Sequence, residues 1–148
     1  MVLGAFPSGV IYTLWLKRRT WLNIVVGGLA GSFAVLAGAA AVDPALGRLP
    51  LLLALVLFLW TPPHFWSLAI AYQGDYAAAG VPMLPVVVGM PRAARIVHAN
   101  AIALVAVSLL PVFFGAGPVV LAGAVLGGAS FLRKTHALAR APSRSTAM

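Results

Sequence analysis

Too few side chains in this sequence are charged to cover the surface of a water-soluble domain. Charged residues make up 8% of the 148 residues, whereas a soluble domain has roughly a quarter. Hydrophobic residues make up 62%. Lipid must therefore be the main solvent of the folded chain, and we expect an all-α, polytopic transmembrane helical bundle.

Apolar stretches separated by polar or Gly/Pro-rich segments predict about five spans in one transmembrane domain over residues 1–140. The expected spans are residues 2–16, 22–42, 50–72, 96–114 and 119–132. Residues 141–148 form a small polar tail that we expect to be disordered. The third span carries Pro62 and Pro63, which lack an N–H and disfavour helix in the preceding residue, so we expect that helix to be broken inside the membrane. In the second span, Gly27 and Gly31 form a small-xxx-small pair that favours close helix packing.

The net charge of +8 comes from ten Lys and Arg against two Asp. The basic residues lie in short clusters between apolar runs, as topology-setting charges do, so we do not expect nucleic-acid binding. If the spans alternate in direction, only Arg48 falls on one side. The other side, cytoplasmic by the positive-inside rule, holds Lys17, Arg18, Arg19, Arg92, Arg95, Arg133, Lys134, Arg140 and Arg144.

The absence of cysteine excludes disulfides and thiolate metal sites. The start of the chain does not read as a cleavable signal peptide, because the positive charges follow the first apolar run instead of preceding it.

Two features of the expected cytoplasmic side suggest phosphate chemistry. Asp75, one of the two carboxylates, could be a Mg²⁺ ligand that bridges to phosphate, or it could cap a helix or solubilise a loop. Lys17, Arg18 and Arg19 could clamp a diphosphate, or they could simply orient the chain in the membrane. The residues alone leave both pairs of interpretations open.

His64 follows the two prolines, inside the membrane by the length of the span. Its imidazole could ligate haem iron or relay a proton. Alternatively, it could hydrogen-bond backbone groups that the prolines leave without a partner. His98 and His136 lie near expected cytoplasmic span ends, where an interfacial role suffices. This reasoning predicts a polar cytoplasmic site but no particular reaction.

Three strings in the chain, in order, resemble the haem O synthase family of the UbiA prenyltransferase superfamily. The first runs from Tyr12 to Gly31 and contains the basic cluster. The second, residues 59–70, reads Leu-Trp-Thr-Pro-Pro-His-Phe-Trp-Ser-Leu-Ala-Ile, and the third covers residues 75–87. Their order and spacing make the resemblance specific.

The resemblance implies a UbiA-type helical bundle around a central cavity, of which this chain is similar to a part that lacks the N-terminal spans and the last span. It implies transfer of a farnesyl group from farnesyl diphosphate to a vinyl group of haem B, which yields haem O. Mg²⁺ is the implied cofactor, with Asp75 as its ligand and as the catalytic carboxylate. Lys17, Arg18, Arg19 and Asn23 are the implied diphosphate-binding residues, and His64 is the implied haem-binding residue.

The chain departs from the family pattern in its shorter length, in the absence of the final span, and at residues 72–74, which read Tyr-Gln-Gly where the family usually has a basic residue and often a second acid. The first Asp-rich motif of the family is absent, and one carboxylate is too few for two Mg²⁺ ions. We therefore do not expect the chain to turn over alone. It could be a fragment, the product of a mis-started reading frame, or half of a split enzyme whose partner is a separate polypeptide that carries the first motif. Haem A synthase is the alternative partner. The resemblance implies insertion in the lipid bilayer of a bacterial inner membrane, with the active-site loops cytoplasmic. Two alternatives remain: a quinone-type aromatic prenyltransferase, and a non-catalytic membrane subunit that binds haem or lipid.

Overall fold

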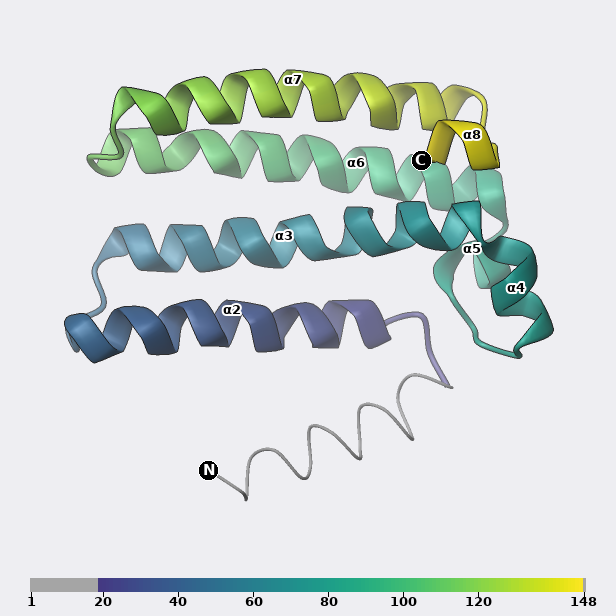
Figure 1. Cartoon of the computed structure of the whole chain (residues 1–148), viewed down its shortest axis with the longest axis horizontal. Helices are drawn as coiled ribbons and strands as arrows, with labels where there is room; N and C mark the ends of the chain where they lie inside the picture. Colours follow the sequence, from purple (N-terminus) through teal and green to yellow (C-terminus); the bar gives the residue numbers. More distant parts are fainter. Residues whose placement is uncertain (1–18, 148) are drawn as a thin grey trace.

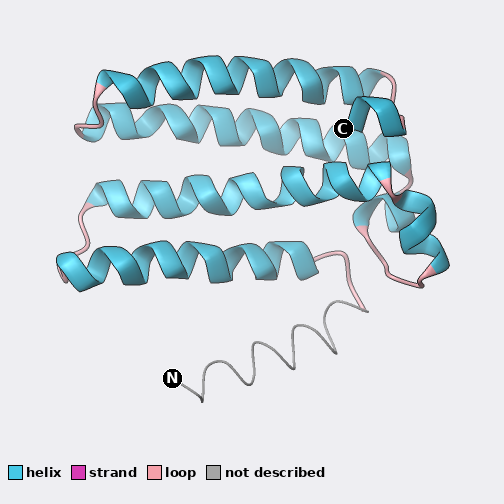
Figure 2. Cartoon of the chain, viewed as in Figure 1, coloured by secondary structure: helices cyan, strands magenta, loops and turns pink. Residues whose placement is uncertain are grey.

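The computed structural model describes residues 19–147, which form helices and no strand (Figure 2). The long helices are α2 (Asn23–Val42), α3 (Arg48–Ala71), α6 (Met90–Leu109) and α7 (Pro118–Arg140). The shorter elements are α4 (Gln73–Ala78), α5 (Leu84–Val88), the 3-10 helix η2 (Leu110–Phe114) and α8 (Arg144–Ala147). The expected all-α fold is confirmed.

The long helices lie side by side, each antiparallel to the next (Figure 1). α2 packs on α3, α3 on α6, and α6 on α7. One end of the bundle holds the loop before Arg48 and the η2 turn, and the other end holds α4, α5 and α8. We call this second end the α4–α5 end. Among the described basic residues, Arg48 alone lies at the first end; the others lie before α2, early in α6, or in the second half of α7 and beyond.

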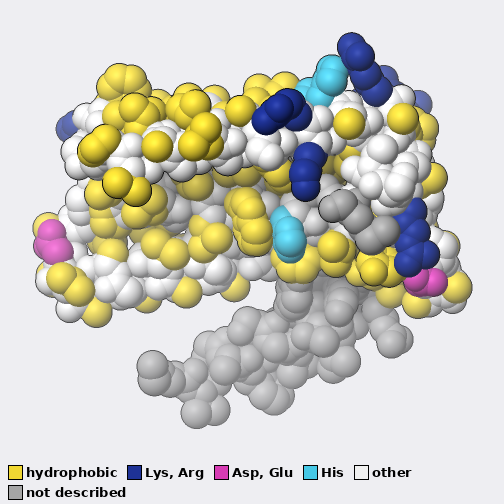
Figure 3. Space-filling model, turned by 45° about the horizontal axis from the view of Figure 1, so that its top comes forward, with side chains coloured by type: hydrophobic (Ala, Val, Ile, Leu, Met, Phe, Trp, Pro, Cys, Tyr) yellow, Lys and Arg dark blue, Asp and Glu magenta, His cyan; other side chains and the backbone are white. Residues whose placement is uncertain are grey.

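Within residues 19–147, three helical stretches are long and apolar enough to cross a membrane: Asn23–Val42, Arg48–Ala71 and Met90–Phe114. Their 20 to 25 residues correspond to roughly 30 Å or more of helix, the thickness of a hydrocarbon core. α7 has 23 residues, but Arg133 and Lys134 lie within it. Large apolar side chains such as Phe33 remain exposed on the bundle, and hydrophobic side chains cover much of the face seen in Figure 3. The chain is therefore a multi-pass membrane protein.

Several helix ends differ from those expected from hydropathy. α6 begins at Met90 instead of residue 96, because Gly89 adopts a φ of +81° and Pro91 favours a first helical turn. α7 continues to Arg140 instead of ending at residue 132, since Lys and Arg are good helix formers. Residues 144–147, expected to be disordered, form α8, which contacts both α3 and α7. The first expected span, residues 2–16, lies outside the described residues.

The expected break at Pro62 and Pro63 does not appear, because α3 continues through both residues as one helix. Proline fixes φ near −65°, a helical value, but it removes the N–H that would bond the carbonyl four residues earlier. The carbonyls of Phe58 and Leu59 therefore lack their usual donors. Both prolines are buried, and α3 packs against α2 on one side and against α6 on the other. Tertiary contacts thus outweigh the local preference.

α2 and α3 approach closely at Gly28 and Ser32. A methyl group at Gly28 would lie 3.2 Å from the Thr61 Cβ. The buried Ser32 hydroxyl donates across the interface to the Ala54 carbonyl at 3.0 Å. Of the two glycines expected to favour close packing, Gly31 faces α3, where an added Cβ would lie 3.7 Å from Leu57 Cδ2.

Candidate functional site

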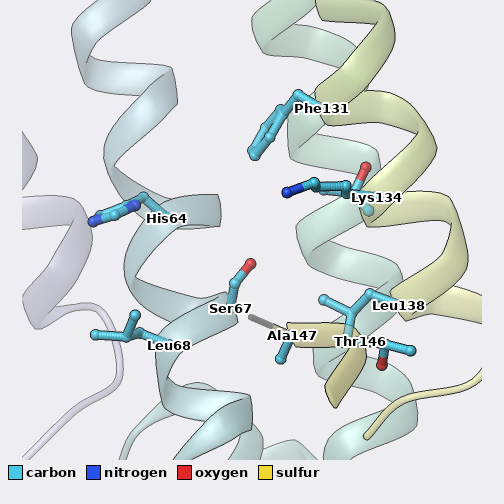
Figure 4. Close-up of a pocket in the computed structure, with 9 residues that line it drawn as sticks. His64, Ser67, Leu68, Phe131, Lys134, Leu138, Thr146 and Ala147 are labelled. Carbon is cyan, nitrogen blue, oxygen red and sulfur yellow. The ribbon is translucent and has the colours of Figure 1, made fainter. Parts of the chain in front are cut away.

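A groove of about 340 Å³ lies between α3 and α7. Both helices pack on α6, and α8 contacts both at the α4–α5 end. In Figure 4, Ser67 on α3 and Lys134 on α7 point toward one another across this groove, and Phe131 also points into it. The groove is lined by His64, Ser67, Leu68, Phe131, Lys134, Thr135, Leu138, Thr146 and Ala147. It combines a cation and hydroxyl groups with apolar walls.

His64 forms part of the α3 wall of this groove and is held by aromatic neighbours. Its ring stacks on Trp60, one turn earlier, with the centroids 4.5 Å apart and the planes 14° apart. The Phe65 ring meets it edge-on at 5.3 Å. Within residues 19–147 its nitrogens form no hydrogen bond, so the expected alternative, a bond to backbone groups near the prolines, is not formed. Ring stacking therefore sets the orientation of the imidazole.

Asp75 lies in the first turn of α4, and its side chain is exposed. The N-cap position belongs to Tyr72, which makes no side-chain capping bond, so Asp75 does not cap the helix. The segment around it is fixed: Gln73 Nε2 donates to the Pro85 carbonyl at 2.8 Å, and Gly80 takes a φ of +65° to turn the chain. The carboxylate is thus presented from an ordered segment at the α4–α5 end.

The structure brings only some of the predicted residues together. Asp75 is not part of the groove that contains His64, and His64 lies seven residues before the end of α3, or roughly 10 Å along the helix. Arg19 is exposed beside the start of α2, at the same end as α4, and Asn23 is 1% exposed. Lys17 and Arg18 lie outside the described residues. The diphosphate-binding role of these four residues stays a prediction.

Magnesium requires oxygen ligands, and the described part of the chain offers few. No group of three or more His, Cys, Asp or Glu side chains gathers within residues 19–147. However, Mg²⁺ at phosphate-processing sites is held by one or two carboxylates together with waters and substrate phosphates. Asp75 therefore fits as one protein ligand of such an ion, but it does not make a complete site by itself.

Sequence reasoning missed Ser67 as a candidate and treated Lys134 only as a topology-setting charge. A signal was present in α7. Phe131, Lys134, Thr135 and Leu138 follow the i, i+3, i+4, i+7 spacing of one helix face. The sequence pattern does not indicate that these α7 residues lie across a groove from Ser67 on α3; only the folded structure shows it.

His98 and His136 join α6 to α7 beside this groove. His98 Nδ1 lies 3.0 Å from the Thr135 hydroxyl, which in turn donates to the Leu132 carbonyl. The His98 and His136 ring centroids are 5.3 Å apart. These contacts fix the side of α7 from which Lys134 projects.

Comparison with known proteins covers the whole chain. The UbiA prenyltransferase family matches residues 1–148. Protoheme IX farnesyltransferase 2 of Paramagnetospirillum magneticum is 66% identical over 146 residues, which cover 99% of this chain and 51% of that protein. Protoheme IX farnesyltransferase 1 of Cenarchaeum symbiosum is 45% identical over 143 residues, which cover 97% of this chain and 48% of that protein.

A protoheme IX farnesyltransferase of Thermus thermophilus is 46% identical over 148 residues, which cover 99% of this chain and 24% of that protein. No solved structure matches the chain. The chain spans about half the length of the first two relatives and less of the third. Because the family match extends over every residue and the relatives are this similar, the chain belongs to the UbiA prenyltransferase family.

Proposed function

We propose that this chain forms part of an enzyme that transfers the farnesyl group of farnesyl diphosphate to a vinyl group of protohaem IX (haem B), giving haem O. The observation that carries this proposal is the 66% identity to a protein named for that activity. The same names favour a haem substrate over the aromatic acid of a quinone-type prenyltransferase.

Asp75 is the proposed Mg²⁺ ligand on this chain. It is exposed, ordered and at the end of the bundle where Arg19 lies. When bound, Mg²⁺ stabilises the negative charge that develops on the leaving diphosphate. Arg19, together with Lys17 and Arg18, adds cationic donors suited to diphosphate oxygens. Asp75 thereby contributes to catalysis through charge stabilisation.

His64 is the proposed contact to haem. Stacking on Trp60 and the edge contact with Phe65 hold its ring in one orientation while the nitrogens remain available. A histidine nitrogen in this state is a suitable haem-iron ligand. The proposed role is to orient the porphyrin so that its vinyl group faces the farnesyl donor.

The α4–α5 end is the proposed cytoplasmic face, in a bacterial inner membrane. Every described basic residue except Arg48 lies in that half of the bundle, as the positive-inside rule requires. The chain has no cysteine, so a single introduced cysteine is its only site for maleimide labelling. Ala77 and Ala45 are exposed at opposite ends of the bundle, and we would replace each in turn, as Ala77→Cys and Ala45→Cys. An impermeant maleimide should label only Ala77→Cys in inverted vesicles, and labelling of Ala45→Cys instead would reverse the topology.

The activity is tested with membranes that contain this chain, haem B, farnesyl diphosphate and Mg²⁺, followed by chromatography of the extracted haem. Product that disappears when Mg²⁺ is chelated supports the proposal. If no product forms, the chain is co-expressed with a polypeptide that carries the first Asp-rich motif of the family. Product under those conditions marks this chain as half of a two-chain enzyme, and no product in either case contradicts the proposed function.

A further inference from the structure

We propose that the groove between α3 and α7 binds a carboxylate of the porphyrin substrate through the Lys134 ammonium and the Ser67 hydroxyl. This inference rests on the proposed function. It assigns a binding role to Lys134, which lies outside the three strings that resemble the family, and to Ser67, which lies in the second string but had no role assigned to it. The occupant is a propionate of protohaem IX, with the flat macrocycle extending along the apolar wall of the groove.

The first support is the arrangement of the two polar groups. Ser67 and Lys134 project from different helices toward the same space (Figure 4). The Ser67 hydroxyl donates to the Pro63 carbonyl at 2.6 Å, a carbonyl that also accepts the Ser67 backbone N–H in an α-helix. Rotating this hydroxyl toward a ligand therefore leaves no helix carbonyl without a donor.

The second support is the charge of the groove. The carboxylates of the chain are Asp43, in the loop at the far end, and Asp75, on α4, and neither lines the groove. Lys134 lies in the second half of α7, toward the α4–α5 end, and its side chain is exposed. Within residues 19–147 its ammonium forms no ion pair, so it has no anionic partner there. An anionic ligand supplies that partner.

The third support is the shape and polarity of the walls. Leu68, Phe131 and Leu138 provide apolar surface on both sides of Lys134. A volume of about 340 Å³ is at the small end of the roughly 300–1,000 Å³ range of ligand pockets. It suits one edge of a porphyrin, where the propionates lie. A diphosphate, in contrast, is normally held with Mg²⁺, and none of the described residues that line the groove carries a carboxylate side chain for that ion.

His64 connects this groove to the proposed haem contact. It lies three residues before Ser67, so the two side chains are neighbours on the α3 surface. Both residues line the groove, but in Figure 4 the His64 ring projects from α3 on the side away from Lys134. The proposal therefore places the porphyrin across the α3 surface, with its centre near His64 and one edge at Ser67 and Lys134. The groove then fixes the in-plane rotation of the porphyrin, which decides which vinyl group is presented.

The test is an absorbance titration of the purified full chain, in detergent micelles, with protohaem IX and with its dimethyl ester, in which both carboxylates are blocked. We expect the wild type to prefer the free acid by about tenfold, the effect of a charge-assisted hydrogen bond. Lys134→Gln should abolish this preference, and Lys134→Arg should retain it. Arg133→Gln, which removes a neighbouring charge outside the groove, is the matched control and should behave as the wild type. Circular dichroism verifies the helix content of each variant.

The outcomes separate this inference from the function on which it rests. If the wild type binds both porphyrins equally, or if Lys134→Gln keeps the preference, the carboxylate contact is wrong while haem binding stands. If inorganic pyrophosphate displaces protohaem from the wild type but not from Lys134→Gln, the groove binds diphosphate, and the porphyrin assignment is overturned. If the wild type binds no protohaem, the proposed function itself fails. The ester comparison on the wild type needs no variant, so a folding defect cannot mask the result.

Discussion

The interface between α6 and α7 allows a sharp prediction, because Gly128 leaves no room for a side chain. A Cβ at this position would lie 2.8 Å from Val105 Cγ1 and 3.2 Å from Cγ2. Valine has one strongly preferred rotamer in a helix, so these methyl groups cannot move aside at low cost. Small residues at such positions are what let membrane helices pack closely. Gly128→Ala should therefore weaken the α6–α7 interface.

The neighbouring Gly127 provides a reference substitution for the change in unfolding free energy caused by Gly128→Ala. A Cβ at Gly127 meets nothing within 4 Å, so Gly127→Ala should only gain helix propensity, about 1 kcal/mol. Gly128→Ala has the same gain but adds an overpacking cost of about 1–3 kcal/mol. The free energies of unfolding of the two variants should thus differ by about 2 kcal/mol, with Gly128→Ala the less stable.

The assay is reversible unfolding in mixed micelles with increasing SDS, followed by far-UV circular dichroism. Adding Val105→Ala to Gly128→Ala removes the two close methyl groups and leaves a Cβ contact of 3.6 Å, which is ordinary. We expect the double mutant to recover the overpacking cost as a coupling energy of about 1–3 kcal/mol. Equal stability of Gly128→Ala and Gly127→Ala would refute the close approach of these helices.

Three further substitutions test the site and the α2–α3 interface. Asp75→Asn, in a protein that also carries the first Asp-rich motif, should abolish farnesyl transfer without preventing membrane insertion; near-normal product would contradict the metal role. His64→Ala should weaken protohaem binding more than it raises the KM for farnesyl diphosphate, and an unchanged haem titration would count against the haem contact. Ser32→Ala removes the 3.0 Å bond to the Ala54 carbonyl and should cost about 0.6–1.7 kcal/mol of unfolding free energy. Ser108→Ala, which loses only a bond within its own helix, is the control, and equal losses from both would show that the interhelical bond contributes nothing.

Hydrophobic length predicted the fold class and the alternation of the helices, because a run of about 20 apolar residues has few other solutions in lipid. The helix ends were harder to predict. A span expected from hydropathy ends at the first charged residues. The helix α7 instead continues through Arg133 to Arg140, since basic residues are compatible with helix. Conversely, the start of α6 depends on the positive φ of Gly89, a local backbone property that composition does not report.

The same limit applies to α3. The two prolines predict a break from local geometry alone, and the continuous helix shows that packing on α2 and α6 decides the outcome. Asp75 and His64 could be selected individually because an acid or a histidine is rare in such a chain. The groove could not be selected in this way, since it exists only because α6 separates α3 from α7.

Two adjacent basic residues of α7 allow membrane orientation to be distinguished from ligand binding. Arg133 and Lys134 are adjacent in α7 and contribute the same charge at nearly the same depth, so a purely topological role predicts equal effects when either is neutralised. Only Lys134 lines the groove. A binding role predicts that its loss alone changes porphyrin affinity. The pair therefore forms a control built into the chain: equal effects would leave membrane orientation as the whole explanation, and unequal effects would assign the groove to an anionic ligand.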